Sequence, residues 1–526
     1  MLQKKGDKVN PIMRDNNGGQ RNNGFHRMFR TAAVAVVSLI ALAIALGAGM
    51  PVFAADPARE FLMEPAAAGI GGKRLFEERA GDDRPKGRTA LFQLPPETLS
   101  GMPPRPAEKF LKYQYSYGSE SEVRYRKDPD LDSRIRDDSL ILAPQLNGTV
   151  IYRPTDWLVT TLEMILEWEV AAQEEKRITL PNGETQFAPK RRASLVADQA
   201  FVTIRGFLAP LEIHAGRRNY EDERHWMFDT SMDIAAITFR QGDFLAEAHV
   251  GREVLWDLDL LKNQTRSKIE NTLLYIEYRG IEDSKLAAYA IKRKHRSSPE
   301  APLHLGMRMY GRPSDSFNYW IERALTRGRD ENNHKLKGSA FDVGAQYRFL
   351  GLPLQPSVAL SYAVGTGDAN PDDDTNYEFR QTGLQSNEAK FSGVTQFKAY
   401  GEVLDPELTN LRIFTAGIGF RPAGNAFVDL VYHNYRTVEV ASGELFSSAV
   451  TALLNRDEMN IRKDVGDEID VILGFRKMFG IQRLGLDLRA GWFFPGKAFR
   501  IPEGDPANPV FRPAGNGSSI IAKFWW

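Results

Sequence analysis

The chain has 526 residues, of which 42% are hydrophobic and 26% charged, and its formal net charge is zero. Residues 1–54 hold seven Lys/Arg and two Asp/Glu, so the remainder has 61 basic against 66 acidic residues, which argues against nonspecific nucleic-acid binding. The absence of cysteine excludes disulfides, thiol catalysis and thiolate metal sites.

The N-terminus has the pattern of a secretory signal. Basic residues up to Arg30 precede an apolar run from Thr31 to Met50, and Val52 and Ala54 occupy the small-residue positions of a cleavage site. We therefore expect a signal peptide over residues 1–54. Because the apolar run is nearly long enough to cross a bilayer, an uncleaved membrane anchor is the alternative.

Residues 55–108 are irregular, rich in Pro, Gly, Arg and Glu, and too poor in apolar residues to build a core. We expect a flexible, Pro-rich periplasmic leader. A binding segment for a periplasmic secretion-complex scaffold is the alternative interpretation, although no specific motif marks one.

From Phe110 onward the hydrophobic pattern has a period of two. Apolar and polar residues alternate from Phe341 to Phe349, and the stretches 303–309, 469–476 and 484–492 repeat the pattern. Strict alternation predicts β-strands with one apolar and one polar face. A soluble β-sandwich shows the same alternation, so the pattern alone leaves two fold classes open.

The lengths of the connections favour a membrane barrel. Short links at Arg153, Leu208, Arg240, Gly280, Gly351, Arg421 and Phe479 alternate with long polar segments at 128–138, 173–192, 220–231, 253–269, 328–338, 365–410, 437–466 and 495–516. We predict an all-β fold over residues 109–526, a transmembrane antiparallel β-barrel of about 18 strands with short periplasmic turns and long extracellular loops. It would lie in the outer-membrane lipid of a Gram-negative cell, and its terminal Trp526 would be read by the barrel-assembly machinery.

In such a barrel the apolar face meets lipid and the polar face lines the lumen. Side-chain parity places inward Arg240, Arg279, Arg308, Arg348, Arg476 and Arg489, together with Glu163, Glu167, Glu247, Glu277, Asp342, Asp470 and Asp487. Either these charges pair across neighbouring strands, or a subset of the arginines is free at a constriction, where a guanidinium pairs well with carboxylates. We expect Arg279 and Arg308 to be tied to neighbouring carboxylates.

The longest connection, of about 46 residues, is several times the usual loop length. Its second half, from Phe379 to Leu411, carries Arg380, Gln381, Lys398 and Glu402 among glycines and amides. This composition favours wet, multi-point contact with a polar chain over core packing.

Two segments resemble the outer-membrane alginate export family. The first begins with RQTGL at Arg380 and continues with SN, FSG, YGE and ELTNL in that order. The second, AGRRNYEDERHW, contains Arg217, Arg218, Asp222, Glu223, Arg224 and Trp226. The resemblance covers most of the chain from Phe110 onward, but these two segments are its specific part.

The resemblance implies an outer-membrane porin that exports an anionic, alginate-like exopolysaccharide by facilitated diffusion through an Arg/Lys-lined lumen. It also implies that Arg217 lines the pore and that its loop folds into the pore; a bulge at Gly216 would turn Arg217 inward. A structural ion-pair cluster is the alternative for this segment. The predicted substrate-binding residues are Arg217, Arg218, Asp222, Glu223, Arg224, Arg380, Gln381, Lys398, Glu402, Arg348, Arg476 and Arg489.

The chain departs from the family pattern at several points. Asp198 and Gln199 stand where the exporter has an Arg-Glu pair, and only FGIQR, around Phe479, replaces a long periplasmic loop. Glu388 replaces an arginine, and a basic run has thinned to Lys398. Fewer cations leave the identity of the polymer open.

The sequence holds no clear motif for catalysis. The eight histidines show no metal spacing, and neither GxSxG nor a phosphate loop is present. We therefore predict no enzyme, no catalytic or metal site and no cofactor. Two rival functions stay open: a general porin of the same family for small anions or sugars, and a membrane-anchored periplasmic enzyme that processes carbohydrate.

Overall fold

The computed structural model describes residues 113–526, except 135–137, 172–176, 180–184, 188–189, 209, 256–258, 262–266, 391–394, 441–444, 446, 448–462 and 504–509. The predicted signal peptide and periplasmic leader lie outside the described residues. Within the described ranges, no helix is long and apolar enough to cross a membrane.

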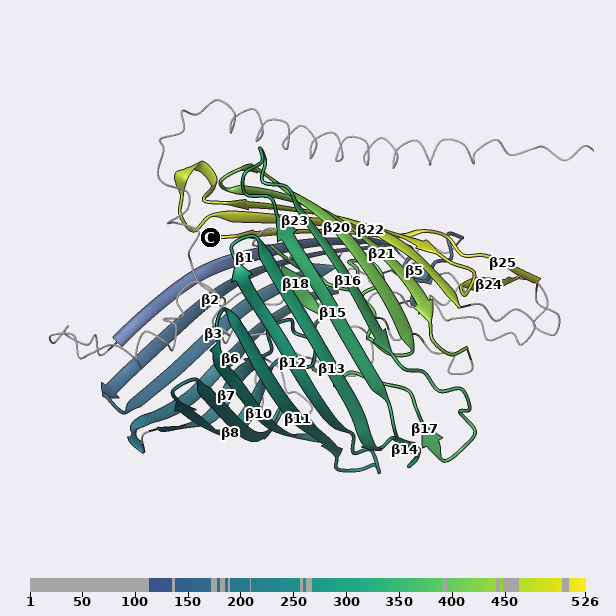
Figure 1. The fold of residues 1–526 in the computed structure, drawn as a ribbon. Helices are drawn as coiled ribbons and strands as arrows, with labels where there is room; N and C mark the ends of the chain where they lie inside the picture. Colours follow the sequence, from purple (N-terminus) through teal and green to yellow (C-terminus); the bar gives the residue numbers. More distant parts are fainter. Residues whose placement is uncertain are drawn as a thin grey trace, which may run out of the picture. The chain divides into compact units, whose positions relative to one another are not determined.

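In the part of the chain that the structure describes, the wall is a closed antiparallel β-barrel of 18 strands (Figure 1). These strands are β1 (Tyr113–Lys127), β2 (Ser139–Thr155), β3 (Leu158–Ala171), β6 (Lys190–Leu208), β7 (Leu211–Glu221), β8 (Asp229–Gln241), β9 (Phe244–Arg252), β10 (Ile269–Ile281), β11 (Ser284–His295), β12 (Leu303–Ser314), β13 (Phe317–Arg329), β15 (Ser339–Arg348), β16 (Ser357–Gly365), β20 (Leu411–Ala423), β21 (Ala426–Thr437), β22 (Asp464–Arg476), β23 (Gly485–Pro495) and β26 (Gly517–Trp525). Short strands decorate the connections: β4 (Arg177–Thr179), β5 (Thr185–Phe187), β14 (Lys335–Leu336), β17 (Thr375–Asn376), β18 (Glu388–Lys390), β19 (Gln396–Lys398), β24 (Arg500–Glu503) and β25 (Val510–Pro513).

The first and last strands close the barrel. β1 pairs antiparallel with β26, and Ser119 and Trp526 exchange backbone hydrogen bonds of 2.9 and 3.0 Å. Because the number of strands is even, β1 begins and β26 ends at the same end of the barrel, which is the end with the short turns. In bacterial outer-membrane barrels this end faces the periplasm.

The exposure of the wall residues is inverted relative to that of a soluble protein. On β12, Leu305 and Met307 are 39% and 60% exposed, whereas His304 and Arg308 are 1% and 3% exposed. Rows of large apolar side chains on an outer surface, with charged residues buried behind them, are stable only against lipid. This arrangement excludes the soluble sandwich and confirms the predicted barrel in the outer membrane.

The predicted short links are turns between wall strands, and the link around Phe479 holds one 3-10 turn, η2 (Met478–Gly480). Two features differ from the expectation. Strands β7 and β8 extend into the segment 220–231, which leaves a connection of only 222–228. The turn 315–316 and the loop 296–302 complete the alternation, although the sequence pattern did not single them out.

Candidate functional site

Two connections from the long-loop end fill the interior of the barrel: the β7–β8 loop (222–228) and the segment 366–410 between β16 and β20, here called the plug loop. Trp226, Met227, Phe379, Leu404 and Leu408 are each at most 1% exposed and belong to one core. The prediction that the segment from Phe379 favours wet contact over core packing is therefore wrong. Its few apolar residues gather in one place, which the average polarity of the segment conceals.

Asp222 organises the β7–β8 loop. Its carboxylate accepts the backbone N–H groups of Trp226, Met227 and Phe228 at 2.9, 2.7 and 3.0 Å, and the Arg308 guanidinium lies 3.2 Å away. Burial alone would raise the pKa of Asp222, but Arg308 and the three N–H groups hold it below its ordinary value. Asp222 is thus an ionised anchor for the loop.

Gln381 joins the two loops. Its Nε2 donates to the Trp226 carbonyl at 2.5 Å and to Asn387 Oδ1 at 2.8 Å. Its Oε1 accepts the Leu408 N–H at 2.7 Å. Because the side chain is also buried, Gln381 holds the interior together and has no face left for a passing polymer.

Two carboxylates of β22, here called the wall clasp, hold the plug loop against the wall. Glu468 accepts the backbone N–H groups of Val403 and Leu404 at 2.6 and 3.0 Å. Asp470 accepts the N–H of Glu402 at 3.2 Å. Both carboxylates are fully buried, so the contact is shielded from water.

Lys398 and Glu402 are charged residues of the plug loop that are already paired. Lys398 Nζ lies 2.8 Å from Asp405 and donates to the Ser386 carbonyl at 3.1 Å. Burial would lower the pKa of Lys398, but Asp405 and Glu388 raise it above its ordinary value. Glu402 pairs with Arg489 at 3.1 Å.

Several inward arginines of the wall are also paired. Arg308 lies 2.6 Å from Glu322, Arg279 pairs with Glu277, and Arg476 lies 2.7 Å from Asp487. The expected pairing of Arg279 and Arg308 with carboxylates is therefore confirmed. These guanidiniums reinforce the wall.

The remaining predicted residues lie at separate points. Arg348 is half-buried at the end of β15, and Arg380 lies 3.5 Å from Glu378 with its side chain 37% exposed. Arg218 lies over the Tyr220 ring, 5.2 Å from its centroid, and Glu223 lies 3.5 Å from Lys285.

Arg217 departs from its predicted place. Gly216 has φ +120°, but β7 pairs with β6 and β8 through this point without a register shift, so the expected bulge is absent. Arg217 lies on the same outward side of β7 as the exposed Ala215, and it is opposite Asp233 of β8. Its Nη1 donates to the Glu253 carbonyl at 2.6 Å, and the residue is 4% exposed. It is a covered structural cation rather than a pore-lining one.

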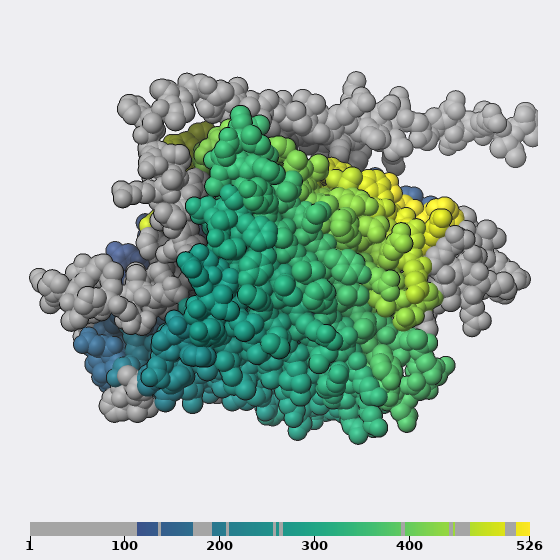
Figure 2. Space-filling model, in the orientation of Figure 1, coloured from purple at the N-terminus to yellow at the C-terminus, as the bar shows by residue number. Residues whose placement is uncertain are grey.

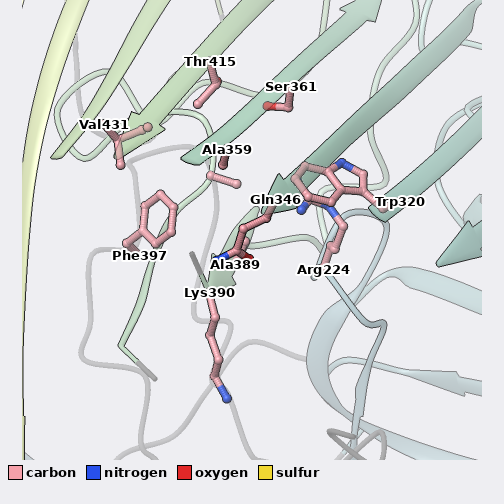
Figure 3. Close-up of a pocket in the computed structure, with 12 residues that line it drawn as sticks. Arg224, Trp320, Gln346, Ala359, Ser361, Ala389, Lys390, Phe397, Thr415 and Val431 are labelled. Carbon is pink, nitrogen blue, oxygen red and sulfur yellow. The ribbon is translucent and has the colours of Figure 1, made fainter. Parts of the chain in front are cut away.

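Arg224 is a predicted cation that borders a hollow in the interior. A partly open hollow lies between the plug loop and the wall strands β13 to β21. Its lining includes Arg224, Trp320, Gln346 and Phe397, and Figure 3 shows the Arg224 and Trp320 side chains lying against each other. The guanidinium carbon is 3.9 Å from the Trp320 ring centroid.

The hollow carries spare hydrogen-bond donors. Among the described residues, Arg224 Nε and Gln346 Nε2 are buried and have no hydrogen-bond partner. Ser361 adds a hydroxyl group, whereas that of Thr415 is hydrogen-bonded to His433 Nδ1 at 2.9 Å. The Lys390 ammonium points away from these wall residues (Figure 3). A cation, an aromatic face and unused N–H groups together fit a ligand rich in oxygen acceptors.

Sequence reasoning identified Arg224 but missed its partners Trp320 and Gln346. Both have inward parity on β13 and β15, so the alternation could have placed them in the lumen. Only the folded plug loop shows that they face a hollow.

Within the part of the chain that the structure describes, one group of side chains could hold a metal ion. Glu221, His225 and Asp229 place their ligand atoms within 4.8 Å of one another. However, Asp229 faces His225 Nδ1 at 3.1 Å and Glu221 faces Nε2 at 3.8 Å. Because the two carboxylates flank opposite ring nitrogens, the arrangement suits hydrogen bonding across the ring better than one shared ion.

The family described as alginate export matches residues 110–511 of this chain. The chain belongs to the alginate export family. This membership and the barrel together indicate a transporter rather than an enzyme.

Curated relatives and solved structures add detail. The alginate production protein AlgE of Azotobacter vinelandii is 26% identical over 451 residues, covering 75% of this chain and 92% of that protein. AlgE of Pseudomonas aeruginosa is 28% identical over 177 residues, covering 31% of this chain and 34% of that protein. Among solved structures, P. aeruginosa OccK7 (OpdD) gives a TM-score of 0.49 at 12% identity, covering 79% of this chain and 99% of that one. P. aeruginosa OccK1 (OpdK) gives a TM-score of 0.48 at 11% identity, covering 78% of this chain and 98% of that one.

The departures from the family pattern have clear places in the structure. Gln199 donates to the inward Glu163 at 2.7 Å, and Asp198 is the fully buried extra residue of a β-bulge in β6. The link that holds Phe479 is a short turn between β22 and β23, and Phe479 is 81% exposed on it. Among the described residues, the interior is instead filled by the plug loop and the β7–β8 loop.

Proposed function

We propose that this barrel exports an anionic, alginate-like exopolysaccharide by facilitated diffusion through its lumen. Membership of the alginate export family and the names of the curated relatives support the substrate class. The observation that carries the proposal is the hollow beside the plug loop, where Arg224 Nε and Gln346 Nε2 have no partner among the described residues. A polyuronate presents carboxylate and hydroxyl acceptors along its whole length, and these match such donors once the plug loop has left the wall, because both N–H groups are buried while it is in place.

The contact with each sugar is weak and replaceable. Arg224 already shares its charge with Asp342, which lies 3.5 Å away, and rests on Trp320. A carboxylate of the polymer therefore meets a guanidinium whose attraction is moderated, so that one sugar is exchanged for the next without trapping the chain. Polymer synthesis inside the cell supplies the drive, and no cofactor takes part.

The polymer passes when the plug loop leaves the wall. This step rests on the burial of the plug loop against the lumen face and on the wall clasp, whose bonds run to residues 402–404. A hydrogen bond to a charged group contributes only about 1.5–3 kcal/mol. A small set of such bonds can hold the loop in place and still release it.

The test removes the spare donors of the hollow. Arg224→Gln combined with Gln346→Leu should lower the anion preference of the pore, because a positive charge is lost in a narrow, poorly screened space. Block of the ion current by a polyuronate should weaken as well. Arg436→Gln, on the exposed outer face, is the matched control and should change neither. Selectivity and block that stay at the wild-type level in the double variant would remove the hollow from the path.

The same recordings separate export from a general porin. An exporter should show current that a polyuronate blocks from the periplasmic side. Flux of small anions or sugars with no polymer block would favour the general porin for small solutes.

A further inference from the structure

The outer face of the barrel carries cations at its long-loop rim. Parity places Lys292 and Lys294 of β11 and Arg323 and Arg327 of β13 outward, and all four are exposed. These four residues are called the basic rim patch below. Strands β11 and β13, which bear them, lie in the wall that faces the viewer in Figure 1, and Figure 2 shows the same side of the molecule.

Register places the four cations close together. Lys292 is opposite Leu303 of β12, and Leu303 is opposite Arg327, so Lys292 and Arg327 occupy one row about 10 Å apart. Arg323 is four residues from Arg327 along β13, roughly 13 Å in an extended strand. The patch therefore covers an area comparable to a disaccharide with a charged group at each end.

The patch stands at the border of the apolar band. Leu274 and Leu305 lie in the row directly below that of Lys292, and both are exposed. Arg323 lies opposite Met307 of β12, within the apolar band. On its other side it lies opposite Phe341, which is only two residues from the start of β15 at the long-loop end. Its long apolar stem can lie along lipid while the guanidinium reaches the polar layer.

Protein groups balance the charge of the patch only in part, since Arg327 Nη1 donates to the Thr326 and Gly338 carbonyls at 2.8 and 3.2 Å. Among the described carboxylates, none forms an ion pair with any of the four residues. The carboxylate opposite Lys294 in register, Glu270, is paired with Arg252 at 3.8 Å and Arg296 at 3.3 Å. Exposed cations at this depth, without acidic partners, attract anionic lipid headgroups.

The four cations form one group on the rim, and a second exposed pair, Arg412 and Arg436, stands at the long-loop ends of β20 and β21. The outward side chains near the long-loop ends of β3 and β23 are aromatic, with Trp168, Trp492 and Phe494 exposed. A general belt of interfacial lysines and arginines would surround the whole barrel. The aromatic sector interrupts any such belt, so the basic rim patch is a local group of cations.

We propose that the basic rim patch binds the phosphorylated disaccharide headgroup of an outer-leaflet glycolipid, lipid A. The row of Lys292 and Arg327 would take one phosphate and Arg323 the other, while the acyl chains lie on the apolar band below. This interaction fixes the lipid beside β11 and β13, of which β13 also lines the hollow, and it is independent of what the lumen carries.

The test compares the full-length protein with Lys292→Gln/Arg323→Gln/Arg327→Gln in mild detergent. Hexa-acylated lipid A is titrated and counted by native mass spectrometry. Loss of three cations should weaken binding roughly 10- to 100-fold. Lys477→Gln/Arg312→Gln, at the short-turn end, is the matched control and should bind as the wild type does. A folded barrel, checked by its migration on unheated gels, is required of every variant.

Two further arms identify the source of the anion. Dephosphorylated lipid A should bind the wild type as poorly as lipid A binds the triple variant, and inorganic phosphate should not displace lipid A. Equal binding of lipid A to the triple variant and the wild type would overturn the proposal. Equal binding of phosphorylated and dephosphorylated lipid, or displacement by inorganic phosphate, would overturn it as well.

Discussion

Asp222 and Arg308 show at the scale of single residues why the interior keeps its shape. They are 5% and 3% exposed, and they join the β7–β8 loop to β12. Removing one partner of a buried pair leaves the other charge without compensation, which costs roughly 3–5 kcal/mol. The pair is therefore a stability element, and its loss should act on the loop before it acts on the barrel.

Asp222→Asn should release the β7–β8 loop. The amide keeps the size of the side chain but loses the charge that faces Arg308, so the loop should lose about 3 kcal/mol of stability. Hydrogen exchange at the Trp226, Met227 and Phe228 amides measures this loss. Glu223→Gln is the neighbouring control, because Glu223 is only partly buried beside Lys285. Unchanged protection in the Asp222 variant would contradict the anchoring role.

The same carboxyl predicts a pH dependence. The pKa of Asp222 is lowered in the folded protein, so its ionisation stabilises the loop above the ordinary carboxyl pKa of about 4 and stops doing so as pH falls through the lowered value. Protection of the three amides should decrease as pH falls below about 4. The Asp222→Asn variant should show no such decrease.

Individual residues also show what sequence reasoning could and could not reach. The pairing of Arg279 and Arg308 follows from parity, because inward charges on neighbouring strands meet. The burial of Arg217 does not follow from parity, because it depends on the segment after β9, which covers an outward-facing position. The stacking of Arg224 on Trp320 joins a loop to a distant strand and leaves no local pattern.

At the scale of elements, the wall and the plug loop differ in how their sequences specify them. Each wall strand repeats one rule, apolar outward and polar inward, so its position follows from alternation and turn spacing. The plug loop has no such period. Its position is fixed by contacts such as those of Gln381 and of the wall clasp, which involve residues far apart in the chain.

Glu468→Leu should loosen the plug loop without harming the wall. The substitution leaves the Val403 and Leu404 N–H groups without an acceptor, at a cost of about 1–3 kcal/mol for each. Single-channel recordings should show more frequent openings, and the two amides should exchange faster. Asp467→Asn changes the neighbouring residue on the outward side of β22 and serves as the control. Closed-state lifetimes equal to those of the wild type would rule out the clasp.

At the scale of the whole molecule, the seam between β1 and β26 decides whether the barrel exists. Trp526 exchanges hydrogen bonds with Ser119, and its ring lies 6.0 Å from that of Tyr117. An 18-strand wall with one seam unpaired would expose backbone groups to lipid, where each costs several kcal/mol.

Trp526→Asp should therefore block assembly. A charge at the end of the last strand disturbs both the seam and the terminal aromatic that the assembly machinery reads. Trp526→Phe should insert normally, and so should a chain trimmed from Ala55 to Ala107, because the wall begins at Tyr113. Heat-modifiable migration and outer-membrane fractionation measure assembly. Normal insertion of the aspartate variant would show that the seam tolerates a charge.

The central claim is that the plug loop must leave the wall for polymer to pass, and an engineered disulfide tests it most directly. The chain has no cysteine, and a Cβ atom built at Gly474 of β22 would lie 3.4 Å from Thr395 Cβ in the plug loop. This is close to the roughly 3.5–4.5 Å that a disulfide requires. The single variants Thr395→Cys and Gly474→Cys are the controls, and Thr395→Cys is the better matched of the two, because a Cβ atom at Gly474 would lie 2.1 Å from Thr395 Oγ1 and displace it.

The measurement is polymer export, with pore conductance recorded in parallel, for the Thr395→Cys/Gly474→Cys variant before and after reduction. The account predicts that the oxidised variant assembles normally but exports no polymer, and that reduction restores export to the level of the single variants. Wild-type export by the fully oxidised variant would contradict the account, because the polymer would then pass with the plug loop tied to the wall.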